Sequence, residues 1–292
     1  MNQCHHSLES GTSIWHAMKW AQEVLEVNNR PDAQIDAKLL MLYVLEYNES
    51  QLLLNRQKAM PSEQLEKYRF YVLTRAKGVP LQHITHEQEF MGLNFYINEN
   101  VLIPRQDTES LIEKLLEINE TAHFCTGIDI GTGSGCIGIS LAHYIKGLKM
   151  TLIDVSDKAL EVARSNVRAH GLEEAIVTLK SDMLSAYEGE KVDLIVSNPP
   201  YIAKEDMADL MIEVKEYEPH LALTDEGDGL YFYRAISKEA KIYLKKGGFL
   251  AYEIGYNQGE AVTTILENEG YESIELFQDL AGNNRVIIAK NK

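Results

Sequence analysis

Apolar residues in the first part of the chain, up to about residue 85, recur at helical spacing in three clear segments. Ser13 caps the first segment, Asp32 opens the second, and the third runs from Pro61 to Gly78. Their apolar stripes are Ile14, Met18, Ala21 and Leu25; Ile35, Leu39 and Leu42; and Leu65, Tyr68, Val72 and Ala76. The stripes predict the core of a small helical bundle, with the charged residues between them facing solvent.

From about residue 124, short apolar runs alternate with helical patterns. Strands are predicted at 125–130, 149–154, 175–180, 192–197, 248–254, 271–277 and 284–290, and helices at 135–145, 157–170, 230–245 and 257–269. This alternation predicts an α/β domain with a doubly wound, mostly parallel sheet of seven strands. The segment between the last two strands is too short for a crossover helix, so these two should pair antiparallel.

Residues 86–103 lie between these two parts and differ from both. The stretch from Glu89 to Ile97 predicts a short β-hairpin that turns near Gly92. We therefore divide the chain into a helical N-terminal domain at 1–85, a hairpin linker at 86–103 and a larger domain at 104–292. Asp107 or Thr108 is expected to cap the helix that opens this larger domain.

Composition and charge narrow the classes of partner. Among the 292 residues, 45% are hydrophobic and 25% are charged, as in soluble globular proteins. The net charge of -16 counts against direct nucleic-acid binding, which usually requires a basic surface, and favours a protein or small-molecule partner.

Three features bear on the cellular setting. No apolar run approaches the length of a membrane span, and the first six residues lack the pattern of a signal peptide. Cys4, Cys125 and Cys136 show no zinc or disulfide-framework spacing. We expect a reduced, cytoplasmic setting, with no membrane association and no metal site.

A glycine-rich stretch, residues 128–135, ends the first strand of the predicted sheet and reads Ile-Asp-Ile-Gly-Thr-Gly-Ser-Gly. Glycines there permit a tight turn and a close approach of the backbone to a ligand. Asp154 ends the next strand, 19 residues beyond Gly135, where a carboxylate can bind both hydroxyls of a ribose. Together these features predict a cofactor that contains a nucleoside. Residues 133–138 also match the dinucleotide pattern G-x-G-x-x-G, so the glycines alone leave the cofactor open.

The fourth strand stops at Asn198-Pro199-Pro200-Tyr201, because proline cannot continue a central strand. In open α/β sheets, ligands bind at the carboxyl ends of the strands. The Asn198 side-chain oxygen and the Pro199 carbonyl can both accept hydrogen bonds from a planar NH₂ group, and Tyr201 offers a flat face. The motif predicts a site that orients a weakly nucleophilic nitrogen. A strand-ending turn without chemistry is the alternative.

The glycine stretch resembles the first motif of the S-adenosylmethionine-dependent methyltransferases, and the residues after the fourth strand resemble the motif of enzymes that methylate planar nitrogens. The resemblance implies S-adenosyl-L-methionine as cofactor, bound by Gly131, Thr132, Gly133, Ser134, Gly135, Asp154, Asp182, Met183 and Asn198. It also implies that Asn198, Pro199, Pro200 and Tyr201 bind the substrate, with Asn198, Pro199 and Tyr201 as the catalytic residues.

Further segments narrow the resemblance to one family, the peptide chain release factor glutamine methyltransferases. The similar segments are Gly78-Val79-Pro80-Leu81-Gln82-His83-Ile84, Phe90-x-Gly92, Leu102-Ile103-Pro104-Arg105-x-x-Thr108-Glu109, Asn198-Pro199-Pro200-Tyr201-Ile202, Glu218-Pro219, Ala222-Leu223, Gly227-x-Gly229-Leu230, Glu253-Ile254-Gly255 and Asp279-Leu280-Ala281-Gly282-x-x-Arg285. Two residues depart from the family pattern: Gln106 replaces a proline, and Met183 replaces an aromatic residue found in some members.

The resemblance implies a Rossmann-like methyltransferase fold with a helical N-terminal domain for substrate recognition and a hairpin linker. It also implies methylation of the side-chain amide of glutamine in the Gly-Gly-Gln loop of bacterial release factors. Two other functions stay open: methylation of an adenine or guanine amino group in a nucleic acid, and cofactor binding without turnover. The long connection at 202–228 is either a lid or binding loop, or a short surface helix with irregular flanks.

Overall fold

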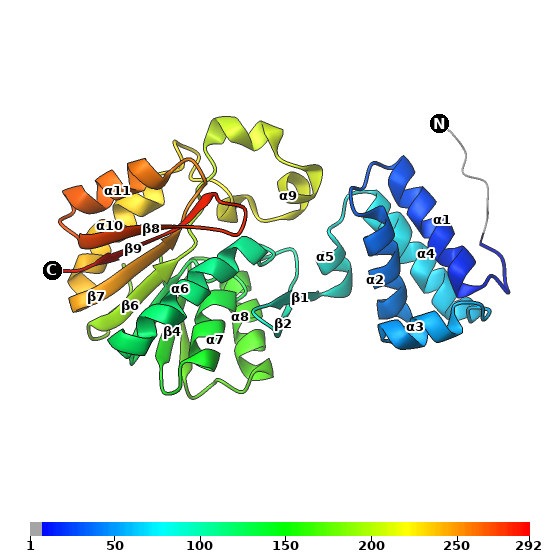
Figure 1. The fold of residues 1–292 in the computed structure, drawn as a ribbon, viewed down its shortest axis with the longest axis horizontal. Coiled ribbons are helices and arrows are strands. Elements are labelled where there is room, and N and C mark those ends of the chain that lie inside the picture. Colours follow the sequence, from blue (N-terminus) through cyan, green and yellow to red (C-terminus); the bar gives the residue numbers. More distant parts are fainter. Residues whose placement is uncertain (1–7) are drawn as a thin grey trace. The chain divides into compact units, whose positions relative to one another are not determined.

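The computed structural model describes residues 8–292, which divide into two compact units, one ending at His86 and the other running from Glu87 to Lys292 (Figure 1). Cys4 and the rest of the first seven residues of the predicted N-terminal domain lie outside the described residues. Among the helices of residues 8–292, none combines the length and the apolar character that a membrane span needs.

The first unit is helical, as the apolar stripes predict. Its helices are α1 (Ile14–Val27), α2 (Ala33–Leu45), α3 (Glu49–Asn55), α4 (Ser62–Ala76) and α5 (Leu81–Thr85). The predicted cap of the first helix is confirmed, because the Ser13 hydroxyl accepts a hydrogen bond from the His16 backbone N–H. Gly78 follows α4 in the left-handed region, with φ of 104°, which a side chain would disfavour. The core is built mainly from α1, α2 and α4.

The predicted buried face of the second helix was wrong. Ile35 and Leu39 are 57% and 39% exposed, and the buried residues of α2 are Ala33, Asp36, Ala37, Leu40, Met41 and Val44. This helix is apolar around most of its circumference, so periodicity does not select one face. The Arg75 guanidinium of α4, buried in the same core, donates to the Asp36 carboxylate at 2.6 Å, which requires Asp36 to face inward.

The second unit contains the predicted seven-stranded sheet. Its strands are β3 (Thr126–Ile130), β4 (Lys149–Asp154), β5 (Ile176–Lys180), β6 (Val192–Ser197), β7 (Leu244–Glu253), β8 (Glu272–Gln278) and β9 (Asn284–Lys290). They lie in the order β5-β4-β3-β6-β7-β9-β8, and β9 runs antiparallel to both of its neighbours. From β3 the chain adds β4 and β5 on one side, and from β6 it adds β7 on the other, so the order of strands reverses between the parallel neighbours β3 and β6. Ligands of α/β sheets bind at such a point.

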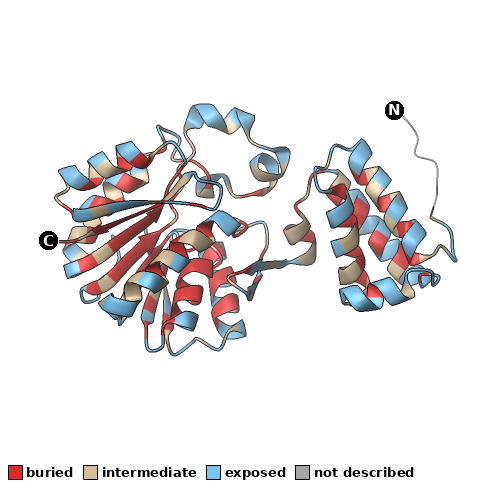
Figure 2. Cartoon of the chain, in the orientation of Figure 1, coloured by how far each residue is buried: buried red, intermediate tan, exposed pale blue. Residues whose placement is uncertain are grey.

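Helices cover both faces of this sheet, as the doubly wound prediction requires. The packed residues on one face come from α6 (Gln106–Ala122), α7 (Cys136–Tyr144) and α8 (Asp157–Ala169). Those on the other face come from α10 (Tyr231–Tyr243) and α11 (Gly259–Asn268). Figure 2 shows the central strands almost wholly buried between these layers.

Two expectations about how elements begin were wrong. Neither Asp107 nor Thr108 caps α6: Arg105 occupies the N-cap position, and the Thr108 hydroxyl donates instead to Glu253. Strand β7 begins at Leu244 rather than at residue 248, because the chain stays extended through a register irregularity opposite β6.

The predicted hairpin is present as β1 (Glu87–Phe90) and β2 (Leu93–Tyr96). Met91 and Gly92, both with positive φ, form its turn. The hairpin lies within the second unit. Its Tyr96 backbone N–H donates to the Asn166 side chain of α8 at 2.7 Å, and the Asn166 amide donates back to the Tyr96 carbonyl at 3.1 Å.

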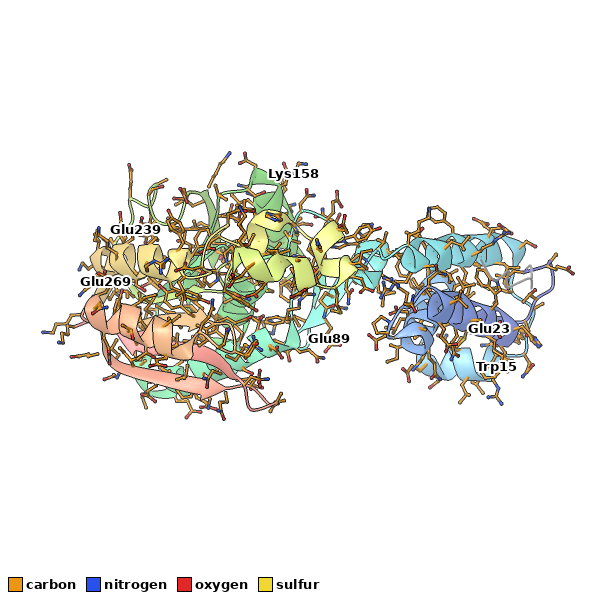
Figure 3. The ribbon with its side chains drawn as sticks, turned by 90° about the horizontal axis from the view of Figure 1, so that it is seen from above. Trp15, Glu23, Glu89, Lys158, Glu239 and Glu269 are labelled. Atoms are coloured by element: carbon orange, nitrogen blue, oxygen red, sulfur yellow. The ribbon has the colours of Figure 1, made fainter. Side chains whose placement is uncertain are left out.

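The buried ion pair in the helical unit generates a stability prediction. Replacing Asp36 with Ala removes the carboxylate to which the buried Arg75 guanidinium donates, so the helical unit should lose about 3–5 kcal/mol of unfolding free energy. Both tryptophans of the chain, Trp15 and Trp20, lie in α1 (Figure 3 labels Trp15), so denaturation followed by tryptophan fluorescence reports on this unit.

The matched control is the exposed pair between Lys38 and Glu49, at 2.5 Å, in the same unit. Glu49→Ala should cost at most about 1 kcal/mol, because solvent screens an exposed pair. Equal losses of unfolding free energy in Asp36→Ala and Glu49→Ala would contradict the proposed contribution of the buried pair to stability.

Candidate active site

The carboxyl ends of β3, β4 and β6 surround a cavity of about 170 Å³. Eight of the predicted site residues line it: Gly131, Gly133, Asp154, Asp182, Met183, Asn198, Pro199 and Pro200. Apolar side chains, among them Ile153, Leu221 and Phe232, complete the wall. A mostly apolar hollow with a few convergent polar groups is the usual form of a small-molecule site.

The other predicted residues stand behind this lining. Thr132, Ser134, Gly135 and Tyr201 contribute no part of it in the described structure. Gly135 is the N-cap residue of α7, with φ of 85°, and a Cβ there would lie 2.8 Å from the Ile139 side chain. Its hydrogen atom is therefore required for packing, whereas a Cβ on Gly131 or Gly133 would meet no atom within 4 Å. These last two glycines leave open space above the backbone, toward the cavity.

A buried carboxylate supports the glycine loop from below. Asp129 accepts hydrogen bonds from the Thr132 hydroxyl at 2.6 Å and from the Gly138 backbone N–H at 3.1 Å. Burial raises the pKa of Asp129 to about 7, although both hydrogen bonds oppose the rise. Thr132 thus stabilises the loop rather than facing the cavity. The sequence-based predictions gave Asp129 no role, although it stands first in the glycine motif.

Asp154 joins the glycine loop to the start of α8. One carboxylate oxygen accepts from the Gly133 backbone N–H at 3.0 Å, and the other accepts from the Ser156 backbone N–H at 2.9 Å. The pKa of Asp154 is raised above its ordinary value because burial outweighs the opposing effect of these hydrogen bonds. The carboxylate also lines the cavity, so its remaining lone pairs can accept hydrogen bonds from a ligand.

Asp182 and Met183 form the next part of the wall, directly after β5. Met183 has φ of 46°, an uncommon conformation for a residue with a side chain. Both residues, which the resemblance assigns to the cofactor, line the same cavity as Asp154.

The Asn198-Pro199-Pro200 segment forms the rim at the end of β6. The preceding residue, Ser197, donates its hydroxyl hydrogen to the Ile130 carbonyl at 2.7 Å and thereby ties the ends of β6 and β3 together. The Asn198 side-chain nitrogen donates to the Thr108 hydroxyl at 3.4 Å. The structure therefore brings the predicted amide and the two prolines into the same cavity as Asp154.

Tyr201 points to a second buried carboxylate, Glu253, at the end of β7. The Tyr201 hydroxyl donates to one oxygen of Glu253 at 3.2 Å, and the Thr108 hydroxyl donates to the other at 2.5 Å. Burial raises the pKa of Glu253; the Thr108 hydrogen bond and the charge of Arg285 oppose the rise. The sequence-based predictions gave Glu253 no role in the site and considered Thr108 only as a helix cap. The sequence feature that could have identified Glu253 is its position as an acidic residue at the end of an apolar strand.

The connection at 202–228 closes one side of the cavity with Pro219, Leu221 and Ala222. It contains η1 (Lys204–Asp209), α9 (Ile212–Tyr217) and η2 (His220–Ala222), so it is a short helix with irregular flanks that also forms a wall. Buried Glu218 anchors it, accepting from the Ile103 backbone N–H at 3.2 Å and pairing with Arg105 at 2.5 Å.

Comparison with known proteins agrees with this geometry. Residues 16–85 match the PrmC N-terminal domain, and residues 106–227 match the methyltransferase small domain. A release factor glutamine methyltransferase from Clostridium acetobutylicum is 41% identical over 94% of this chain and 98% of its own length. The chain belongs to the release factor glutamine methyltransferase family. A second member, from Fusobacterium nucleatum, is 42% identical over 92% of this chain and 76% of its own length.

The fold of this family member is shared with more distant methyltransferases. The catalytic domain of hMettl16, solved in complex with an RNA hairpin, matches with a TM-score of 0.57 at 17% identity, over 87% of this chain and 92% of that chain. A likeness at this identity shows the fold alone. Within residues 8–292, no group of three or more His, Cys, Asp or Glu side chains is placed to hold a metal ion.

The raised pKa of Asp129 generates a pH prediction. In the unfolded chain this carboxyl releases its proton near its ordinary pKa of 3.8, and in the folded protein it keeps the proton up to about pH 7. Its contribution to stability is therefore complete below about pH 4 and is lost as the pH rises toward 7.

Asp129→Asn removes this titration while keeping the shape of the protonated acid. The wild-type unfolding free energy, minus that of Asp129→Asn, should fall between about pH 4 and 7 and then level off. Chemical denaturation followed by circular dichroism measures this difference, with the exposed Asp209→Asn as control. A difference that does not change with pH would show that folding leaves the pKa of Asp129 unshifted.

Proposed function

We propose that this protein transfers a methyl group from S-adenosyl-L-methionine to the side-chain amide nitrogen of glutamine in the Gly-Gly-Gln motif of peptide chain release factors. One observation carries the proposal: in a member of the release factor glutamine methyltransferase family, Asn198, Pro199 and Pro200 line the same cavity as Asp154 and the glycine loop. The amide-binding motif and the nucleoside-binding residues therefore share one space.

The residues of the cavity fit the cofactor. Gly131 and Gly133 leave space above their backbones for the methionine part, Asp154 offers carboxylate lone pairs to the ribose hydroxyls, and Asp182 and Met183 flank the place for the adenine. Thr132, Ser134 and Gly135 shape the loop from behind. When bound, S-adenosyl-L-methionine supplies a methyl group that is activated by its positive sulfonium.

The amide nitrogen of glutamine is a poor nucleophile, because its lone pair is delocalised into the carbonyl. In our proposal the Asn198 side-chain oxygen and the Pro199 carbonyl accept hydrogen bonds from its two N–H groups and direct the nitrogen toward the donor. The nitrogen gains the methyl group and releases one proton to solvent. Positioning of this kind can lower the barrier by several kcal/mol.

The same motif on a nucleic-acid methyltransferase would serve an adenine or guanine amino group. The net charge of -16 disfavours that substrate, because a phosphate backbone needs a basic surface. A protein substrate also gives a role to the PrmC N-terminal domain, residues 16–85, which we propose as a further recognition surface. We accordingly propose a cytoplasmic enzyme and keep the functional division at 1–85, 86–103 and 104–292.

The proposal is tested by incubating the protein with isotopically labelled S-adenosyl-L-methionine and, in separate reactions, an unmethylated bacterial release factor or RNA. We expect one added methyl group on the glutamine of the Gly-Gly-Gln motif, located by peptide mass spectrometry. A release factor with that glutamine replaced by asparagine is the control and should stay unlabelled. Label in RNA instead of the release factor would support the nucleic-acid alternative, and no transfer to either would overturn the enzymatic proposal.

Asn198→Ala separates chemistry from cofactor binding. The variant should fold, and saturating S-adenosyl-L-methionine removes any effect of a lost contact between Asn198 and the cofactor. Under that condition, single-turnover methyl transfer should slow by about a hundredfold or more, the cost of lost positioning. Asn198→Asp keeps two acceptor oxygens and is expected to retain part of the rate. If Asn198→Ala transfers methyl at the wild-type rate, the segment from Asn198 to Tyr201 is only a strand-ending turn and has no part in the chemistry.

A further inference from the structure

Thr108 lies between the predicted amide-binding residue and the buried carboxylate of Glu253. It is 2% exposed in the first turn of α6, and Glu253 is 1% exposed at the end of β7. The Thr108 oxygen is 2.5 Å from a carboxylate oxygen of Glu253 and 3.4 Å from the Asn198 side-chain nitrogen. These contacts form a chain from Glu253 through Thr108 to Asn198.

The direction of the hydrogen bonds in this chain follows from proton counting. Burial opposes the ionised form of Glu253, and the hydroxyl groups of Thr108 and Tyr201 and the charge of Arg285 favour it. In this form both carboxylate oxygens are acceptors, and the two hydroxyls lie where each donates to one of them. A separation of 2.5 Å is typical of a hydroxyl that donates to a carboxylate. Because a threonine hydroxyl has one proton, Thr108 has lone pairs left for Asn198 but no second proton.

The orientation of the Asn198 amide then has one solution. Its NH₂ group must face the Thr108 lone pairs, so its Oδ1 atom takes the opposite position. In the reversed orientation, Oδ1 would face an oxygen that has no proton to give, and the NH₂ group would face the N–H groups of the substrate. Two donors opposite one another cannot bind, so the reversed form would not hold the glutamine amide.

We propose that Thr108 and Glu253 are positioning residues that fix the orientation of the Asn198 amide for methyl transfer. The inference rests on the proposed function, because it takes Asn198 Oδ1 as an acceptor for the substrate amide. Neither Thr108 nor Glu253 lines the cavity in the described structure, so they act through Asn198.

The surroundings hold Glu253 in place for this role. The Tyr233 hydroxyl of α10 donates to the Glu253 carbonyl at 3.0 Å, and Arg285 of β9 donates to the next carbonyl, that of Ile254, at 3.4 Å. The positive charge of Arg285 also favours the ionised form of Glu253. The backbone that carries the carboxylate is thus held by two elements other than its own strand.

Thr108→Val and Thr108→Ser are the matched test variants. Valine keeps the shape of threonine and lacks the hydroxyl, whereas serine keeps the hydroxyl. With saturating cofactor and release factor, Thr108→Val should lower kcat about tenfold, the effect of losing one hydrogen bond, without changing KM or cofactor affinity. Thr108→Ser should restore most of the rate. If Thr108→Val does not fold, Thr108→Ala replaces it.

A second measurement does not depend on turnover. In protein labelled with ¹⁵N-asparagine, the side-chain NH₂ signal of Asn198 is assigned by its loss in Asn198→Ala. Its exchange with solvent should be slow in the wild type and Thr108→Ser and faster in Thr108→Val. If the wild type fails to methylate release factors, the proposed function fails, and this exchange rate still tests the hydrogen bond.

Two results would overturn the positioning role. One is equal kcat for the wild type and the hydroxyl-free variant. The other is equal loss of kcat in Thr108→Val and Thr108→Ser, because a purely packing role gives no rescue by the hydroxyl.

Discussion

The burial of the Glu253 carboxylate is the constraint on which one side of the site depends. A buried charge is tolerated when hydrogen bonds and an opposite charge compensate for lost hydration. Here Thr108 and Tyr201 supply the hydrogen bonds and Arg285 supplies the charge. These partners come from α6, from the exit of β6 and from β9, so satisfying one carboxylate brings three separate elements together beside Asn198.

A second buried carboxylate has the corresponding role at the glycine loop. Asp129 holds the glycine loop through Thr132 and the Gly138 backbone, and Asp154 holds the same loop through Gly133. The loop is thereby supported on two sides while Gly131 and Gly133 face open space. Parallel strands bring their carboxyl ends to one edge of a sheet, so the two halves of the site lie beside each other without any further device.

Strand positions and site motifs could be predicted from the sequence because their signals are local. The apolar runs, the glycines with positive φ and the two prolines after Asn198 each act on their own neighbourhood. The contact of Thr108 with Glu253 could not be predicted in this way. The position of Thr108 at the start of a helix suggests a cap, whereas Glu253 lies 145 residues away in the sequence. The prediction of the inward face of α2 failed for the same reason, because Asp36 is paired with Arg75, 39 residues away.

The central claim is that the amide of a glutamine side chain is held between Asn198 and Pro199, with the Asn198 NH₂ group turned toward Thr108. A crystal structure of the protein with S-adenosyl-L-homocysteine and a Gly-Gly-Gln release factor measures this directly. We expect the glutamine nitrogen within hydrogen-bonding distance of both Asn198 Oδ1 and the Pro199 carbonyl. A glutamine amide bound away from residues 198–201 would contradict the account.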